Sequence, residues 1–388
     1  MPWKKPTDHA PQGAFVRDVL RRTACFGRVC RRHGISRKTG YKWWGRFLRR
    51  GDAGLRMRSC RPHRLVRRWP EWLRAGVRQL RRSYRTWGAK KLCWALRRRW
   101  PRRRLPHPRT LERWSPRVAP VHQSRRGPQL PPLVRQPVRR ANDVWTVDFK
   151  GWFRTTDGTR IEPLTVRDLH SRSVLLVSAV AAQSDQVVRR RFTALFRRRG
   201  LPRALWIDNG PPFGGSGALG LTTLSVWWLR LGVQVEFGRP AHPQDNAAHE
   251  QMHRVLKAET ANPPAANAAA QQARFRRWCR TYNDQRPHES LGMQVPAQHY
   301  RPSPRRWPRR LPDWHYPARW SVRRVSRGGR ISWAGRRRLI GRAFAAERIA
   351  LRTRADHHEV YLGPHLLGQL YPADAGGLRP AKRAKSKP

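Results

Sequence analysis

The stretch VWTVDFKGWF (residues 144–153) decides the expected fold, because its alternating β-branched and aromatic residues are typical of a strand. Two similar runs follow, EPLTVRD (162–168) and SVLLVSAVAA (173–182). The turn signals Asp157-Gly158 and DLHSR separate the three runs. The spacing predicts three consecutive antiparallel strands.

Beyond the third run, the period of the apolar residues alternates between helix and strand. We expect helices over 183–199, 219–231, 245–259 and 268–283, and strands over 203–208 and 233–237. Three meandering strands followed by alternating helices and strands predict an α/β fold, with a mixed sheet covered by helices.

The charge of the chain indicates the class of its partner. The 388 residues include 84 Lys or Arg and 23 Asp or Glu, a net charge of +61. An acidic disordered regulator is excluded, and 38% hydrophobic residues are enough to form packed cores. GC-biased coding explains part of the Arg excess without changing its sign. An excess of this size predicts nucleic acid as the partner.

Apolar runs and cysteines indicate the compartment. The longest apolar run, 174–182, is half of the roughly 18 residues that a membrane span needs. The start MPWKKPTDHAPQ lacks the apolar core of a secretory signal. We therefore expect a cytoplasmic, nucleoid-associated protein with no membrane contact. Five cysteines without a CxxC pair predict reduced, mostly buried thiols and no structural zinc.

The charge is distributed unevenly along the chain. Residues 1–140 hold 41 basic and 5 acidic residues, 141–300 hold 21 and 13, and 301–388 hold 22 and 5. The middle segment suits carboxylate chemistry, whereas both flanks suit binding to a polyanion. Charge and Pro-rich stretches predict a helix-turn-helix DNA-binding domain (1–55), a second helical DNA-binding unit (65–118), a linker (119–142), a catalytic core (143–300), a linker (301–318), a small β-rich DNA-contacting domain (319–372) and a disordered basic tail (373–388).

The first flank carries a helix-turn-helix pattern. Apolar residues recur at helical spacing between Ala14 and Leu48, with a break at His33-Gly34 and an N-cap at Ser36. The second helix of such a unit lies in the major groove, so the base or phosphate candidates at its start are Arg37, Lys38, Thr39 and Lys42. A plain basic helical hairpin is the alternative. The stretch 70–114 is equally well explained as a packing module without base contacts.

Three carboxylates of the middle segment form a candidate metal site. Asp148 lies within the first strand, Asp208 ends the fourth, and Glu250 lies in the first turns of a helix opened by HPQDN. Clustered carboxylates repel one another unless cations bind between them. Two Mg²⁺ (or Mn²⁺) ions would suit oxygen ligands and phosphoryl displacement. Taken alone, each acid is better explained as an ordinary surface or turn residue.

Four stretches carry a family resemblance: VWTVDFKG, LWIDNGPPF, HPQDNAAHEQMHRVLKAET and YNDQRPHESLG, together with the amino-terminal CRRHGISRKTGYKW. The chain resembles bacterial insertion-sequence transposases of the DDE integrase-core type, relatives of retroviral integrase. The resemblance implies a ribonuclease-H-like core in which Asp148, Asp208 and Glu250 are catalytic and hold the metals. Ala247 departs from the pattern, because relatives usually carry Gly after the Asn of the third stretch.

Side chains near Glu250 are candidate DNA ligands. Helical spacing places Arg254 and Lys257 on the face of Glu250, and Asn246 lies one turn earlier. An ordinary solvated face is the alternative. The acids not chosen for the site are Asp143, Asp157, Asp168, Asp185, Glu236, Asp245 and Glu259.

The last segment of the chain has a strand pattern. Short alternating runs between 320 and 372 predict five strands in a small SH3-like barrel.

Two function classes remain. The first is a transposase that cuts the terminal inverted repeats to expose 3′ ends and joins them to target DNA, acting as a homo-oligomer. The second is a decayed transposase that acts only as a DNA-binding protein or repressor. A general nuclease is a distant third.

Overall fold

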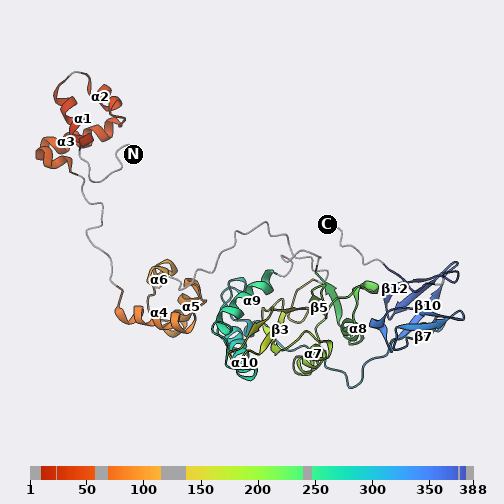
Figure 1. Cartoon of the computed structure of the whole chain (residues 1–388). Helices are drawn as coiled ribbons and strands as arrows, with labels where there is room; N and C mark the ends of the chain where they lie inside the picture. The colour runs from red at the N-terminus through yellow and green to blue at the C-terminus, as the bar shows by residue number, and fades with distance from the viewer. Residues whose placement is uncertain are drawn as a thin grey trace. The chain divides into compact units, whose positions relative to one another are not determined.

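The computed structural model describes residues 10–22, 24–56, 69–114, 137–238, 247–374 and 376–381, and Figure 1 shows their helices and strands. Contacts divide the chain into two compact units, residues 1–69 and residues 70–388. No helix in the described ranges is long and apolar enough to cross a membrane.

The first unit is a small helical bundle. Helices α1 (Ala10–Leu20), α2 (Phe26–Arg32) and α3 (Arg37–Arg50) precede a 3-10 helix over Gly51–Leu55. Ser36 caps α3, because its Oγ accepts a 3.2 Å hydrogen bond from the backbone N–H of Thr39. Helices α2 and α3 approach closely at Gly40, where a Cβ would lie 2.5 Å from the Cys30 sulfur. The predicted N-cap and the break before α3 are confirmed.

Three further helices open the second unit: α4 (Glu71–Ser83), α5 (Ala89–Arg99) and α6 (Pro108–Trp114). Side chains before and within α5 bond to residues about 170 to 200 positions further along the chain. The hydroxyl of Thr86 donates to Glu259, and Lys90 Nζ lies 2.8 Å from the Glu289 carboxylate. These helices are therefore attached to the central domain.

The central domain is built on a mixed sheet. Its strands are β1 (Val144–Phe149), β2 (Phe153–Arg154), β3 (Arg160–Asp168), β4 (Val174–Val180), β5 (Ala204–Ile207) and β6 (Gln234–Phe237). Strand β3 pairs antiparallel with β1, β2 and β4, whereas β1, β5 and β6 run parallel to one another. The predicted α/β fold with a mixed sheet is confirmed.

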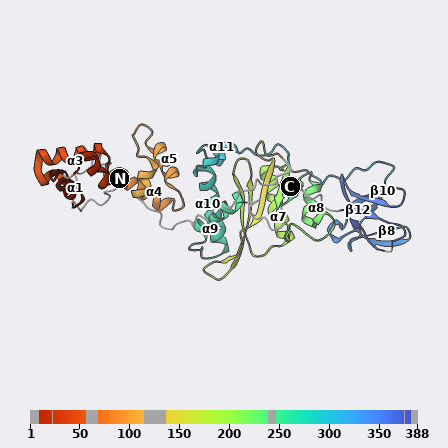
Figure 2. The same ribbon diagram turned by 90° about the horizontal axis from the view of Figure 1, so that it is seen from above.

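Helices cover both faces of this sheet, as Figure 2 shows. Helices α7 (Asp185–Arg199) and α8 (Thr223–Arg230) pack on one face, where Trp145 and Val147 of β1 are buried. Helices α9 (Ala247–Thr260) and α10 (Ala268–Asp284) cover the other face, followed by α11 (Pro296–His299). Because side chains alternate along β1, Thr146 and Asp148 are directed to the α9 face.

The last strands form an antiparallel sheet. Its order is β13-β12-β11-β10-β7, and a separate hairpin pairs β8 with β9. Their bounds are β7 (Ser321–Arg324), β8 (Arg330–Trp333), β9 (Arg336–Leu339), β10 (Arg348–Thr353), β11 (His358–Leu362), β12 (His365–Leu370) and β13 (Arg379–Pro380). Val226 and Leu229 of α8 belong to the apolar core of this sheet. Helix α8 thus contributes to two cores; closure into a barrel stays a prediction.

Two segments differ in detail from the sequence-based expectation. The first predicted strand is interrupted after Phe149, and Gly151 has a φ of +77°, which turns the chain before β2. The predicted linker 301–318 is largely irregular but partly fixed. The hydroxyl of Ser303 donates to the Leu201 carbonyl at 2.7 Å, and Trp307 packs against Phe196. Its extended backbone therefore covers α7.

Glu259 links three segments of the second unit. It accepts hydrogen bonds from Thr86, from the Trp278 indole at 2.6 Å and from Arg286 at 3.3 Å. Replacing Glu259 with Ala leaves the charge of the nearly buried Arg286 guanidinium without a carboxylate, so we expect the free energy of unfolding to fall by about 3 kcal/mol. Lys90→Ala is the control, because the ion pair of Lys90 is exposed and should contribute less than about 1 kcal/mol. If denaturant unfolding showed the same decrease in the free energy of unfolding for Glu259→Ala and Lys90→Ala, this role of Glu259 would be contradicted.

Candidate active site

Asp148 and Asp208 lie at neighbouring strands of the central sheet. Asp148 is near the end of β1, and Asp208 follows the last residue of β5. The parallel register pairs Thr146 with Trp206, and its continuation places Asp148 and Asp208 at the same level. Adjacent strands are about 4.8 Å apart, so the sheet places the backbones of Asp148 and Asp208 side by side.

Glu250 enters from α9, which packs on the same face of the sheet. The residues of α9 turned toward the sheet are His249, Met252, His253 and Leu256, all buried. Glu250, Arg254 and Lys257 are exposed on α9, in agreement with the shared face predicted from helical spacing. Asn246 lies outside the described residues.

Electrostatics connects the three acids. Burial, above all, raises the pKa of Asp148 to about 7, although a backbone hydrogen bond at Phe149 opposes the shift. The negative charges of Asp208 and Glu250 raise this pKa further, whereas Lys150 lowers it. Without a cation, Asp148 therefore binds a proton far more readily near neutral pH than an ordinary aspartate does. A bound cation would favour its ionised form.

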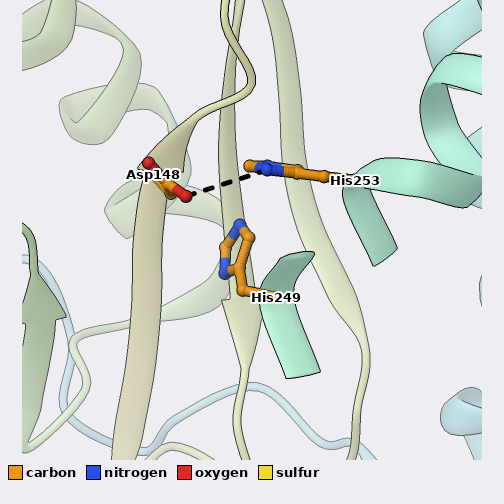
Figure 3. Close-up of side chains that lie close together, drawn as sticks. All are labelled: Asp148, His249 and His253. Carbon is orange, nitrogen blue, oxygen red and sulfur yellow. Dashed lines mark ion pairs between the residues drawn. The ribbon is translucent and has the colours of Figure 1, made fainter. Parts of the chain in front are cut away.

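Two histidines that the sequence analysis did not select lie against Asp148, as Figure 3 shows. One ligand atom of each of Asp148, His249 and His253 lies within 4.8 Å of the others. His253 Nδ1 is 3.7 Å from Asp148 Oδ2. Burial lowers the pKa of His253 to about 3 and that of His249 well below its usual value. HEQMH (249–253), two histidines one helical turn apart, was the signal that could have found them.

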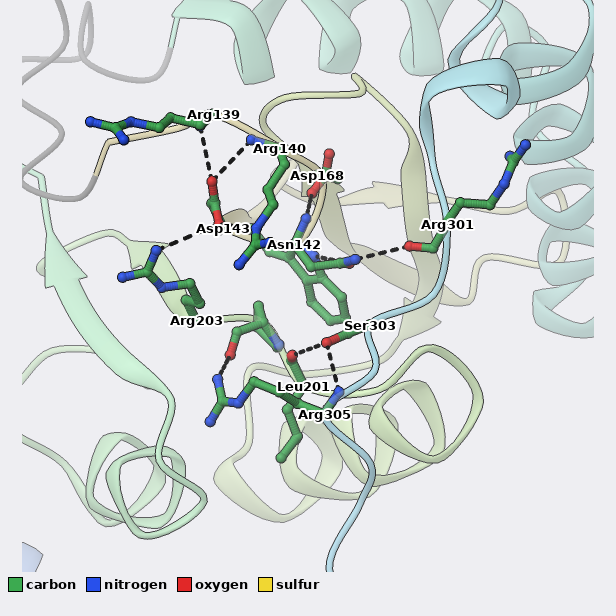
Figure 4. Close-up of polar contacts among 12 residues, drawn as sticks. Arg139, Arg140, Asn142, Asp143, Asp168, Leu201, Arg203, Arg301, Ser303 and Arg305 are labelled. Atoms are coloured by element: carbon green, nitrogen blue, oxygen red, sulfur yellow. Dashed lines mark hydrogen bonds and ion pairs between the residues drawn. The ribbon is translucent and has the colours of Figure 1, made fainter.

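Other acids near the sheet have structural roles, which Figure 4 shows. Asp143 is 3% exposed and accepts hydrogen bonds from the backbone N–H groups of Arg139 and Arg140. Asp168 is fully buried and accepts from the backbone of Asn142 at 2.7 Å and from Ser171. These carboxylates hold the entry into β1 and the turn after β3, so leaving both out of the metal site agrees with their contacts.

Basic side chains occur in the central domain and, separately, on α3. Lys150 follows Asp148 by two residues and lines a small pocket together with Trp152 and Lys257. On α3, the predicted DNA ligands Arg37, Lys38 and Lys42 are exposed. Thr39 is half-buried, and its hydroxyl lies 3.0 Å from that of Ser36, so it participates in the cap.

Comparison with protein families finds three matching segments. Residues 231–296 match the integrase core domain, residues 320–370 match the C-terminal domain of IS481 family transposases, and residues 11–83 match the leucine-zipper of insertion element IS481. In the described part of that last range the structure has separate helices, α1 to α4.

Curated relatives carry insertion-element names. An uncharacterized 31.7 kDa protein of insertion element IS407 from Burkholderia multivorans is 28% identical over 40% of this chain and 54% of its own length. An uncharacterized 39.2 kDa protein of insertion element IS476 from Xanthomonas euvesicatoria is 31% identical over 40% of this chain and 44% of its own length. The chain spans about half the length of the curated relatives it matches.

Among solved structures, the HTLV-2 integrase catalytic core domain in complex with magnesium is 14% identical, covers 42% of this chain and 98% of that chain, and has a TM-score of 0.33. The mixed sheet and the family matches define a protein with an integrase core. More specifically, three segments of the chain are similar to insertion-sequence transposases of the integrase superfamily.

Proposed function

We propose that this chain is a DDE-type polynucleotidyl transferase that cleaves the 3′ ends of an insertion sequence and joins them to target DNA. The observation that carries the proposal is the backbone placement of the three acids. Asp148 and Asp208 lie at the same level on adjacent parallel strands, and Glu250 comes from a helix packed on the same face. The repulsion of Asp208 and Glu250 on Asp148 supports their proximity.

The three acids fit a divalent metal. Their donors are carboxylate oxygens, which Mg²⁺ prefers, and Asp208 and Glu250 are open to solvent. A cation also compensates the repulsion that raises the pKa of Asp148. Asp148, Asp208 and Glu250 would hold two Mg²⁺ or Mn²⁺ ions. When bound, such ions activate the attacking oxygen and stabilise the leaving oxygen of a phosphoryl displacement.

The basic residues would position the DNA. Arg254 and Lys257 extend from the exposed face of α9, and Lys150 lies beside Asp148, so phosphates held by them would border the carboxylates. Asn246 belongs to the same proposed set. Helix α3 would recognise the terminal inverted repeats through Arg37, Lys38, Thr39 and Lys42. The partners are double-stranded DNA and further copies of the chain, in the cytoplasm at the nucleoid.

A decayed transposase acting only as a repressor is the second candidate, motivated by the charge of both flanks. The two functions separate in a strand-transfer assay with the inverted repeats that flank the gene and a plasmid target. Joined product that requires Mg²⁺ supports the transposase. Specific binding of the repeats, with no joined product in the presence of any divalent ion, supports the repressor.

The role of α3 predicts an effect on specificity. Replacing Arg37 or Lys42 with Ala removes an exposed cation from the start of α3, so affinity for terminal-repeat DNA should fall about 10-fold. Affinity for scrambled DNA at the same salt concentration should fall less. Arg17→Ala on α1 is the matched control. Equal loss on both DNAs would indicate phosphate contacts alone, and no loss would favour the helical hairpin.

Arg254 and Lys257 provide a second prediction. Replacing either with Ala should slow single-turnover joining about 10-fold and reduce its salt dependence by about one counterion. Bulk binding would miss this effect, because the net charge of +61 holds DNA elsewhere. Arg198→Ala is the control, since Arg198 is exposed on α7, across the sheet from α9. Unchanged rates and slopes in both α9 variants would favour an ordinary solvated face.

A further inference from the structure

The hydroxyl of Thr165 holds three groups around Asp148. Thr165 lies opposite Asp148 in the β1–β3 register, and its Oγ1 is 2.9 Å from the Asp148 carbonyl oxygen. The same Oγ1 is 2.6 Å from His249 Nε2 and 2.7 Å from His253 Nε2. A hydroxyl has one hydrogen to donate and two lone pairs to accept with. Its three partners therefore use its full capacity.

This arrangement assigns the hydrogens of both rings. A carbonyl oxygen only accepts, so Thr165 donates its hydrogen to Asp148, and both histidines donate Nε2–H to Thr165. The Nδ1 atom of His249 lies 2.7 Å from Thr146 Oγ1, so both nitrogens of this ring are used within the fold. The Nδ1 atom of His253 instead faces the Asp148 carboxylate at 3.7 Å.

The same geometry excludes a zincin-like site. A helix with the pattern HEQMH suggests two histidines that bind zinc through one face, with the intervening Glu as a base. Here both Nε2 atoms converge on the Thr165 hydroxyl, which takes the position between the rings. His249 therefore positions its neighbours and has no nitrogen left for a cation.

We propose that His253 Nδ1 is a nitrogen ligand of the divalent cation held by Asp148, in addition to the three carboxylates. This inference rests on the proposed function, because it concerns the same metal site. Two neighbouring donors bound to one octahedral Mg²⁺ or Mn²⁺ ion at about 2.1 Å lie about 3.0 Å apart. The observed 3.7 Å between Nδ1 and Oδ2 therefore needs a shift of about 0.7 Å.

A nitrogen ligand changes which ion the site prefers. Imidazole suits Zn²⁺ best, and Mg²⁺ prefers oxygen. Mn²⁺ also favours oxygen ligands, but as the first member of the divalent transition series it accepts a nitrogen ligand more readily than Mg²⁺. Replacing His253 with Gln retains an amide donor for Thr165 near the place of Nε2 and removes the nitrogen that faces Asp148. We therefore expect His253→Gln to weaken Mn²⁺ binding about 10-fold or more, and to change Mg²⁺ binding much less.

Pulsed electron paramagnetic resonance of Mn²⁺ bound to the full-length, untagged chain tests the ligand directly. The wild type should show nitrogen modulation from a coordinated imidazole, and labelling with ¹⁵N-histidine should change it without any substitution. His253→Gln should abolish the modulation, whereas His249→Gln should retain it. Circular dichroism establishes that each variant is folded.

The outcomes distinguish this inference from the proposed function. Asp148→Asn should remove the Mn²⁺ at this site. If it does, and the wild type shows no nitrogen modulation, the carboxylate site stands and the His253 ligand is overturned. Modulation that persists in His253→Gln also overturns it. Mn²⁺ binding unchanged by Asp148→Asn would contradict the metal site and the added ligand together.

Discussion

Asp148→Asn, Asp208→Asn and Glu250→Gln will each reduce strand transfer by at least about 1,000-fold while leaving the affinity for DNA nearly unchanged. An amide has nearly the shape of the carboxylate but cannot neutralise a divalent cation. DNA binding should persist, because 63 of the 84 basic residues lie outside residues 141–300. Single-turnover joining of labelled repeat ends with Mg²⁺ measures the effect.

Asp143 offers a control for these substitutions. Its carboxylate is buried and bonded to backbone N–H groups, so Asp143→Asn should lower stability while the fraction that remains folded still joins DNA. Substantial joining by any of the three site variants would remove that residue from the proposed metal site.

Trp228→Ala should have the largest effect on stability, about 4 kcal/mol of the free energy of unfolding. Trp228 is fully buried on α8, and its ring lies 5.0 Å from that of Phe192 and 6.2 Å from that of Phe213. Truncation leaves a cavity between the sheet, α7 and α8. Denaturant unfolding of the full chain measures the loss.

Trp152→Ala is the matched control for this prediction. The Trp152 side chain is 56% exposed, so its removal should change the free energy of unfolding by less than about 0.5 kcal/mol. A similar decrease in the free energy of unfolding for Trp152→Ala and Trp228→Ala would contradict a core centred on α7 and α8.

The strands and helices of the central domain were predictable because local patterns specify them. β-branched runs marked β1, β3 and β4, and the helices predicted over 183–199 and 268–283 correspond to α7 and α10. The interruption before β2 was missed, because the single Gly151 within an aromatic run gave little signal. Tertiary packing, rather than propensity, separates β2 from β1 and pairs it with β3.

Contacts between distant segments could not be predicted in the same way. The bond of Thr86 to Glu259 joins residues 173 positions apart, and nothing in either local sequence indicates the partner. The double role of α8 is similar. Its apolar residues alternate between two cores, which a single helix pattern cannot separate.

Part of the candidate site follows from the sequence. Strand ends and helical spacing indicated Asp148, Asp208, Glu250 and the exposed face with Arg254 and Lys257. His253 was missed because it lies on the neighbouring, buried face of α9, about 60° around the helix from Glu250. The role of Thr165 depends on strand register, which the sequence alone did not give.

The central claim is that this chain joins the 3′ ends of its own element to DNA. Repeat-end duplexes that carry either a 3′-OH or a 3′-dideoxy terminus, incubated with the full chain, Mg²⁺ and a supercoiled plasmid, test it most directly. We predict covalently joined plasmid from the 3′-OH duplex and none from the dideoxy duplex, although both bind equally well. Specific binding of both duplexes with no joined product from either would contradict the claim.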